Sequence, residues 1–210
     1  MNKIVLTVFS IILFVWLIQE IFKFITKKQT GLYISLAILL SATALQYIPI
    51  SQHTITGWIM AVNGNFSIPL LFLVVHKTIN NVLGHDVPLF NKPTVRTAMF
   101  FGIIAGLFLY PMALGLGAYD PYREGFSFSW LFIVLMALNI ILILFKNPFS
   151  FILLCAIISY NLKLLESVNL WDYFIDPFFF ITSILYFLKN TVNAATLKYK
   201  MINESTENTF

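Results

Sequence analysis

The chain has 210 residues, of which 59% are hydrophobic and only 10% are charged, and its formal net charge is +4. A soluble domain carries roughly 25% charged residues, so this composition excludes an ordinary soluble protein and indicates a chain solvated by lipid. No basic run is dense enough for a nucleic-acid surface, and the single cysteine, Cys155, excludes an internal disulfide and a cysteine metal cluster.

About seven apolar segments follow one another along the chain, and each approaches the ~20 residues that cross about 30 Å of hydrocarbon. The first segment has no small-x-small cleavage site, so we interpret it as a retained span and not as a signal peptide. The predicted fold is therefore all-α, a polytopic membrane helical bundle without a separate soluble domain. We predict spans at about 4–22, 31–47, within 55–76, 97–116, 128–145, 148–165 and 170–188.

The basic residues fall in alternate gaps between these segments, which is the positive-inside pattern of a membrane protein. It predicts an amino terminus outside the cell and a carboxy terminus in the cytoplasm. Short loops and the lack of an organelle signal favour a bacterial inner (plasma) membrane. Ten of the 13 Lys and Arg residues define the inner gaps: Lys23, Lys27, Lys28, Lys77, Lys92, Arg96, Lys146, Lys189, Lys198 and Lys200.

Two domain-level expectations follow from this threading. Residues 1–190 form a single transmembrane helical domain. Residues 191–210 are polar and form a cytoplasmic tail that we expect to be disordered.

The segment Asn63–Pro69 interrupts the third apolar stretch with two asparagines, a glycine and a proline. One interpretation is a broken helix at membrane depth, whose freed backbone groups and Asn63 and Asn65 side chains bind a substrate. The other is an interfacial loop, after which Ser67 caps a shorter span and Pro69 lies in its first turn.

The loop after the fourth span holds a dense polar cluster, in which Asp120 and Glu124 flank Arg123. The two carboxylates suit a cation or a proton, and Arg123 suits an anionic headgroup. The alternative is an ordered turn with a surface ion pair worth at most ~1 kcal/mol.

Asp172 and Asp176 are four residues apart at the start of the seventh span, so a helix would place them on one face. Asp176 precedes a proline and can instead cap the apolar run that follows. If the outer loops meet in space, these acids join the earlier polar residues in one substrate-binding site. The candidate set is Asn63, Asn65, Asp120, Arg123, Glu124, Asp172 and Asp176.

Gly102 and Gly106 form a G-x-x-x-G pattern, which is typical of a helix-packing face and offers contact to a membrane-protein partner. The three histidines have no spacing suited to a metal or haem, and we expect no cofactor. Motifs for a Ser/His/Asp triad, a zinc protease and a phosphate-binding loop are absent from the sequence.

Three functions remain open. The first is a small carrier or lipid-handling protein with a polar site facing the outer side. The second is a non-catalytic membrane subunit or assembly factor. The third is a membrane enzyme acting on a lipid or lipid-linked substrate, with Asp120 or Glu124 as its base or metal ligand.

Overall fold

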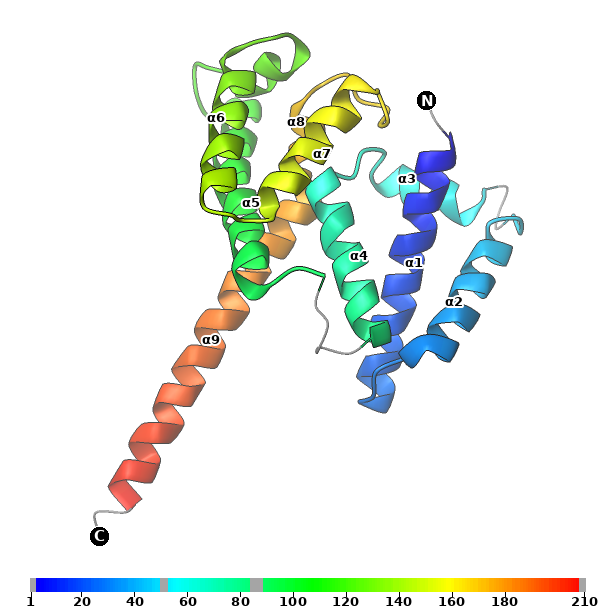
Figure 1. The fold of residues 1–210 in the computed structure, drawn as a ribbon, viewed down its shortest axis with the longest axis vertical. Coiled ribbons are helices and arrows are strands. Elements are labelled where there is room, and N and C mark those ends of the chain that lie inside the picture. Colours follow the sequence, from blue (N-terminus) through cyan, green and yellow to red (C-terminus); the bar gives the residue numbers. More distant parts are fainter. Residues whose placement is uncertain (1–2, 50–52, 84–88, 208–210) are drawn as a thin grey trace.

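The computed structural model describes residues 3–49, 53–83 and 89–207. The described chain is all-helical, as the composition predicts (Figure 1). Its elements in chain order are α1 (Lys3–Thr26), α2 (Gly31–Leu45), α3 (Ile55–Val62), α4 (Ile68–Leu83), α5 (Lys92–Ala113), the 3-10 helix η1 (Pro121–Phe126), α6 (Trp130–Leu144), α7 (Phe149–Asn161), α8 (Trp171–Phe174) and α9 (Pro177–Glu207).

The longer helices run up and down in alternation, and α4 lies between two groups of them (Figure 1). On one side α1 packs against α2 and α4, and the short α3 lies across α1. On the other side α5 packs along α9, while α7 contacts α4, α6 and α8. The core lies where α4, α7, α8 and α9 meet. Its fully enclosed side chains include Phe149, Leu153, Tyr173, Phe174 and Phe179.

Local capping fixes where several helices begin. The Asn91 side chain accepts a hydrogen bond from the Thr94 N–H at 2.9 Å, and the proline that follows Lys92 lies in the first turn of α5. Ser129 caps α6 by accepting from the Leu131 N–H at 3.2 Å. Each cap satisfies a backbone donor that has no partner within its own helix.

The segment Asn63–Pro69 separates α3 from α4. Ser67 Oγ accepts a hydrogen bond from the Leu70 N–H at 3.4 Å, and Pro69 lies in the first turn of α4. The predicted cap and the predicted proline position are therefore confirmed. α3 runs crosswise to α4 near the end at which α4 begins, so the break turns the chain from one helix into the other (Figure 1).

Among the described residues, α1 (over Val5–Thr26) and α5 are long and apolar enough to cross a membrane, judged by length and composition alone. The apolar helices α2, α4, α6 and α7 are shorter than that criterion. They are shorter than the predicted spans because caps and turns take the residues at their ends. The seven-span arrangement therefore stays a prediction.

The exterior is unusually apolar, whereas several polar side chains are buried. Leu40 on α2, Ile104 on α5, Ile133 on α6 and Leu185 on α9 are all more than half exposed, and many large apolar side chains share this exposure. Large contiguous apolar patches are rare on soluble monomers and mark interaction or membrane surfaces. The pattern is compatible with a surface that faces lipid.

The two ends of the bundle differ in charge. We use "basic end" for the end that carries Lys27, Lys28, Lys92, Arg96 and Lys146. Two hydrogen bonds tie its parts together: Thr30 Oγ1 donates to the Asn81 carbonyl at 3.2 Å, and Asn147 Nδ2 donates to Thr97 Oγ1 at 2.8 Å. The opposite "acidic end" comprises η1, α8 and the connections around them. It carries Asp120, Glu124, Glu166, Asp172 and Asp176, together with the two basic residues Arg123 and Lys163.

In the part of the tail that the structure describes, α9 continues as a helix to Glu207, and the expected disorder of residues 191–210 stays a prediction. Extending a formed helix adds one hydrogen bond per residue fixed, and no proline or glycine interrupts the chain after Pro177. Residues 208–210 lie outside the described residues.

Candidate functional site

At the acidic end, η1 docks on the segment that leads into α8. The Trp171 indole N–H donates to the Pro121 carbonyl at 2.8 Å, and Asn169 Nδ2 donates to the Tyr122 carbonyl at 2.8 Å. The Leu170 N–H also donates to the Gly125 carbonyl at 2.8 Å. These bonds hold the loop that we predicted to be a polar cluster against the core.

Within this loop, Asp120 serves as the cap of η1, since its Oδ1 accepts from the Tyr122 N–H at 3.0 Å. Glu124 is half-buried and Arg123 is exposed. Among the described residues, Arg123 forms no ion pair with Asp120 or Glu124. The ordered-turn interpretation therefore describes Asp120 well, but the surface ion pair that it assumed is not formed.

Tyr122 and Asp172 form a hydrogen-bonded titratable pair at the acidic end. The Tyr122 hydroxyl donates to Asp172 Oδ2 at 2.9 Å. Burial, followed by the neighbouring Asp172 carboxylate, raises the pKa of Tyr122 to about 12. Burial likewise raises the pKa of Asp172, against the opposing effect of hydrogen bonds from Ser167 and Tyr122. Tyr122 therefore stays protonated and available as a donor at neutral pH.

Asp176 links the beginnings of two helices. Its Oδ1 accepts from the Phe178 and Phe179 N–H groups at 2.8 and 3.1 Å, which caps α9. Its Oδ2 accepts from the Ser67 N–H at 2.9 Å, just before α4. The capping interpretation of Asp176 is confirmed, and the carboxylate also joins α4 to α9.

The asparagines of the α3–α4 break also reach the acidic end. Asn65 Oδ1 accepts from the Ser167 N–H at 3.1 Å, and Asn63 Oδ1 accepts from the Asn65 N–H at 3.2 Å. Asn63 Nδ2 is buried without a hydrogen-bond partner among the described residues. The structure thus brings Asn65, Asp172 and Asp176 to one end of the bundle, where most of their polar atoms already serve the fold.

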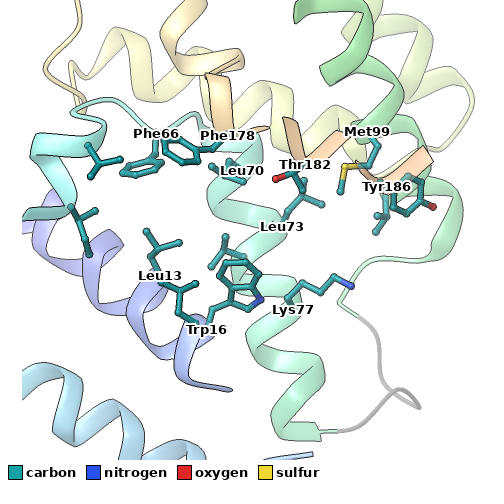
Figure 2. A pocket seen from close by; sticks show the side chains of 15 residues that line it. Leu13, Trp16, Phe66, Leu70, Leu73, Lys77, Met99, Phe178, Thr182 and Tyr186 are labelled. Carbon is teal, nitrogen blue, oxygen red and sulfur yellow. The ribbon is translucent and has the colours of Figure 1, made fainter. Parts of the chain in front are cut away.

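A cavity lies away from the candidate residues of the acidic end. A cavity of about 360 Å³ forms between α1, α4 and α9, with α3 and α5 completing its walls (Figure 2). We call this cavity the lateral groove. Its volume falls within the range of about 300–1,000 Å³ that is usual for small-molecule sites. Its lining residues are Leu13, Trp16, Leu17, Ile59, Val62, Phe66, Leu70, Leu73, Val74, Lys77, Val95, Met99, Phe178, Thr182 and Tyr186.

The polar groups of the groove are few. Among the described lining residues, Lys77 is the one that carries a charge. The other polar side-chain groups described there are the hydroxyls of Thr182 and Tyr186 and the indole nitrogen of Trp16. Figure 2 shows Trp16 and Lys77 together at one end, away from the paired rings of Phe66 and Phe178. Those two rings have centroids 5.6 Å apart. The groove is therefore apolar along its length, with nitrogen donors at one end.

A buried polar network that the sequence reasoning missed joins α1, α2 and α4 near the basic end. Gln19 has no exposed surface, and its Nε2 donates to Ser35 Oγ at 3.0 Å. Asn81 Nδ2 donates to Glu20 Oε1 at 3.0 Å, and the Thr30 and Ser35 hydroxyls lie 2.9 Å apart. Polar residues inside apolar segments were the available signal, since such groups usually pair between helices in lipid.

Gly102 and Gly106 lie where α5 meets α9 of the same chain. A Cβ built on Gly106 would come within 2.2 Å of the Phe180 ring, and one on Gly102 within 2.3 Å of Ser183 Oγ. The predicted helix-packing face is confirmed as an internal seam. A partner helix could reach it only by displacing α9.

Within the described ranges, no three His, Cys, Asp or Glu side chains converge in a way that could hold a metal ion. Comparisons of the chain with protein-family models, with curated proteins and with solved structures found no match. The function must therefore be inferred from the geometry of this chain.

Proposed function

We propose that the chain is a small multi-pass membrane protein that handles lipid by holding an acyl chain in the lateral groove. In this proposal α1, α2, α4, α5, α6, α7 and α9 are the seven spans, with the amino terminus outside and the carboxy terminus in the cytoplasm. Each of these helices overlaps one predicted apolar segment. The membrane would be a bacterial inner membrane.

The main support for this proposal is the lateral groove. Its walls come from helices whose outward faces are apolar, and its lining is apolar over most of its length. In a bilayer such a groove would be solvated by hydrocarbon instead of water, so an acyl chain could enter without leaving an apolar medium. An apolar pocket with a few polar groups is also the usual form of a ligand site.

The acidic end supports an outward-facing ligand site less well. Asp120 and Asp176 cap helices, Asp172 accepts from Tyr122, and Asn65 accepts from Ser167. A ligand would have to replace these hydrogen bonds and would leave buried backbone donors unpaired, at a cost of about 1–3 kcal/mol each. Among the described residues, no contact specifically favours the enzyme or the assembly subunit.

The test is photo-crosslinking in proteoliposomes that contain phospholipids with a diazirine near the end of one acyl chain. Labelled residues are mapped by mass spectrometry. We expect labelling of groove-lining positions such as Leu17, and a several-fold loss of that labelling in Thr182→Trp, whose bulky side chain fills the groove. Ile181→Trp is the matched control, because Ile181 neighbours Thr182 on α9, is exposed and does not line the groove.

Equal groove labelling in Thr182→Trp and Ile181→Trp would contradict the proposal. The same conclusion would follow if wild-type Leu17 were labelled no more than outward positions such as Ile140 on α6.

A further inference from the structure

The lateral groove has a polar end whose groups all donate hydrogen bonds. Lys77 contributes an ammonium group with three N–H donors and no acceptor, and Trp16 contributes one indole N–H. Trp16 Nε1 is buried without a hydrogen-bond partner among the described residues. Figure 2 shows the Trp16 indole nitrogen beside the Lys77 side chain at this end of the groove.

Among the residues that the structure describes, Lys77 has no counter-charge. Among the described residues no carboxylate pairs with it, although the nearby Glu20 is bonded to Asn81. A cation and an unpaired N–H at the end of an apolar groove complement a ligand that has an anionic head and an apolar tail. Hydrogen bonds from a charged donor to an anion are shorter and about twice as strong as those between neutral groups.

The position of Lys77 also fits a headgroup contact. α4 rises about 1.5 Å per residue, so the six residues from Lys77 to Leu83 cover about 9 Å toward the basic end. A lysine side chain can extend along apolar surface and place its ammonium group near a membrane interface. The tail of such a ligand would then run back along the groove toward Phe66 and Phe178.

We infer that the groove binds an anionic lipid from the leaflet at the basic end, with Lys77 and Trp16 Nε1 holding its headgroup. This inference rests on the proposed function, because it names the lipid class that the groove selects. A simpler role for Lys77 is that of one more basic residue attracted to the bilayer surface, without any link to the groove. Lys189, an exposed lysine on α9 that does not line the groove, provides the comparison for that simpler role.

The experiment measures lipid binding to the purified full chain by native mass spectrometry, with anionic phosphatidylglycerol and zwitterionic phosphatidylcholine of identical acyl chains. For the wild type we expect about a tenfold preference for phosphatidylglycerol, the ratio expected from one charge-assisted hydrogen bond of ~1.5 kcal/mol. Lys77→Gln should remove most of the preference, and Lys77→Arg should retain it. Lys189→Gln should leave it unchanged.

Trp16→Phe keeps an aromatic ring in the groove and removes only the N–H donor. We expect it to weaken the binding of both lipids about threefold, because each headgroup carries a phosphate that accepts from the indole N–H. Helix content measured by circular dichroism checks that each variant is folded. Inorganic phosphate in millimolar excess should not displace the lipid, since the acyl chain supplies much of the binding.

The outcomes separate the two proposals. If both lipids bind equally and Lys77→Gln binds like the wild type, the headgroup inference is wrong while lipid handling stands. Equal losses in Lys77→Gln and Lys189→Gln would show a general surface attraction and would also overturn the inference. If neither lipid binds the wild type, the proposed function fails and the inference fails with it.

Discussion

Gly125 shows how a single residue fixes the loop at the acidic end. A Cβ at this position would lie 1.8 Å from Asn169 Oδ1 and 3.0 Å from Trp171 Cδ1. We predict that Gly125→Ala separates η1 from the α8 segment and destabilises the protein by about 1–3 kcal/mol, the usual cost of overpacking. Thermal unfolding in detergent measures this change.

Gly117 provides the matched control for that substitution. It lies in the same connection, and a Cβ there would meet nothing closer than 3.8 Å. Gly117→Ala should therefore unfold at the wild-type temperature. If both alanine variants unfolded at the same temperature, the close packing at Gly125 would not matter for stability.

Asp172 predicts a pH dependence whose sign follows from its environment. Burial raises its pKa in the folded protein, so folding favours the protonated carboxyl group. The resulting stabilisation is fully present below the ordinary carboxyl pKa of 3.8 and is lost as the pH rises through the raised pKa. Asp172→Asn keeps an acceptor for Tyr122 and cannot ionise.

Unfolding temperatures measured between about pH 4 and pH 8 test this prediction. The difference between the wild type and Asp172→Asn isolates the contribution of this carboxyl group from other titrating residues. The wild type should lose stability relative to the variant as the pH rises. A difference that stays constant with pH would rule out the burial argument.

At the scale of elements, the seam between α5 and α9 depends on small residues. The Phe180 ring packs directly on Gly106, where even its Cγ would lie 2.6 Å from an added Cβ. We expect Gly106→Ala to push α9 away from α5 and to cost about 1–3 kcal/mol of stability. Thermal unfolding of the purified protein measures this loss of stability.

Gly57 on α3 is the control for a helical glycine, because an added Cβ there makes only ordinary contacts, the nearest at 3.4 Å from His53 Cβ. Gly57→Ala should be neutral or slightly stabilising, since alanine is the better helix former. Loss of stability in Gly57→Ala equal to that in Gly106→Ala would argue against a specific seam.

Several elements were predictable because their signals are local. Apolar length predicts α1 and α5, the sequence around Ser67 and Pro69 predicts the start of α4, and Asp176 before a proline predicts the cap of α9. The continuation of α9 past residue 190 was missed, since polarity does not reveal a helix that grows from a formed one. The long-range partner of Asp176 was also hidden, because nothing in the sequence shows that its carboxylate accepts a hydrogen bond from the Ser67 N–H.

The lateral groove was beyond sequence reasoning for the same physical reason. Its lining comes from five helices, and Lys77 and Trp16 lie on different helices, more than sixty residues apart along the chain. In the sequence, Lys77 served only as a marker of orientation. Its proximity to an unpaired indole N–H depends on how α1 packs against α4, which no local pattern encodes.

At the scale of the whole molecule, the apolar exterior, the buried polar network and the two oppositely charged ends have one common explanation. In the proposed arrangement, exposed leucines and isoleucines face hydrocarbon, Gln19 and its partners satisfy one another inside, and the basic end lies on the cytoplasmic side. The orientation also decides which leaflet supplies a headgroup to Lys77. Membrane topology therefore decides whether this explanation holds.

The topology can be measured by substituted-cysteine labelling in intact cells, with a membrane-impermeant reagent and a Cys155→Ala background. Ala118→Cys and Val168→Cys place thiols at the acidic end, and Gln29→Cys and Thr196→Cys place them toward the basic end; all four positions are exposed. We predict that the first pair reacts in intact cells and that the second pair reacts only after permeabilisation. Labelling of Gln29→Cys or Thr196→Cys in intact cells, with Ala118→Cys unlabelled, would contradict the proposed membrane arrangement.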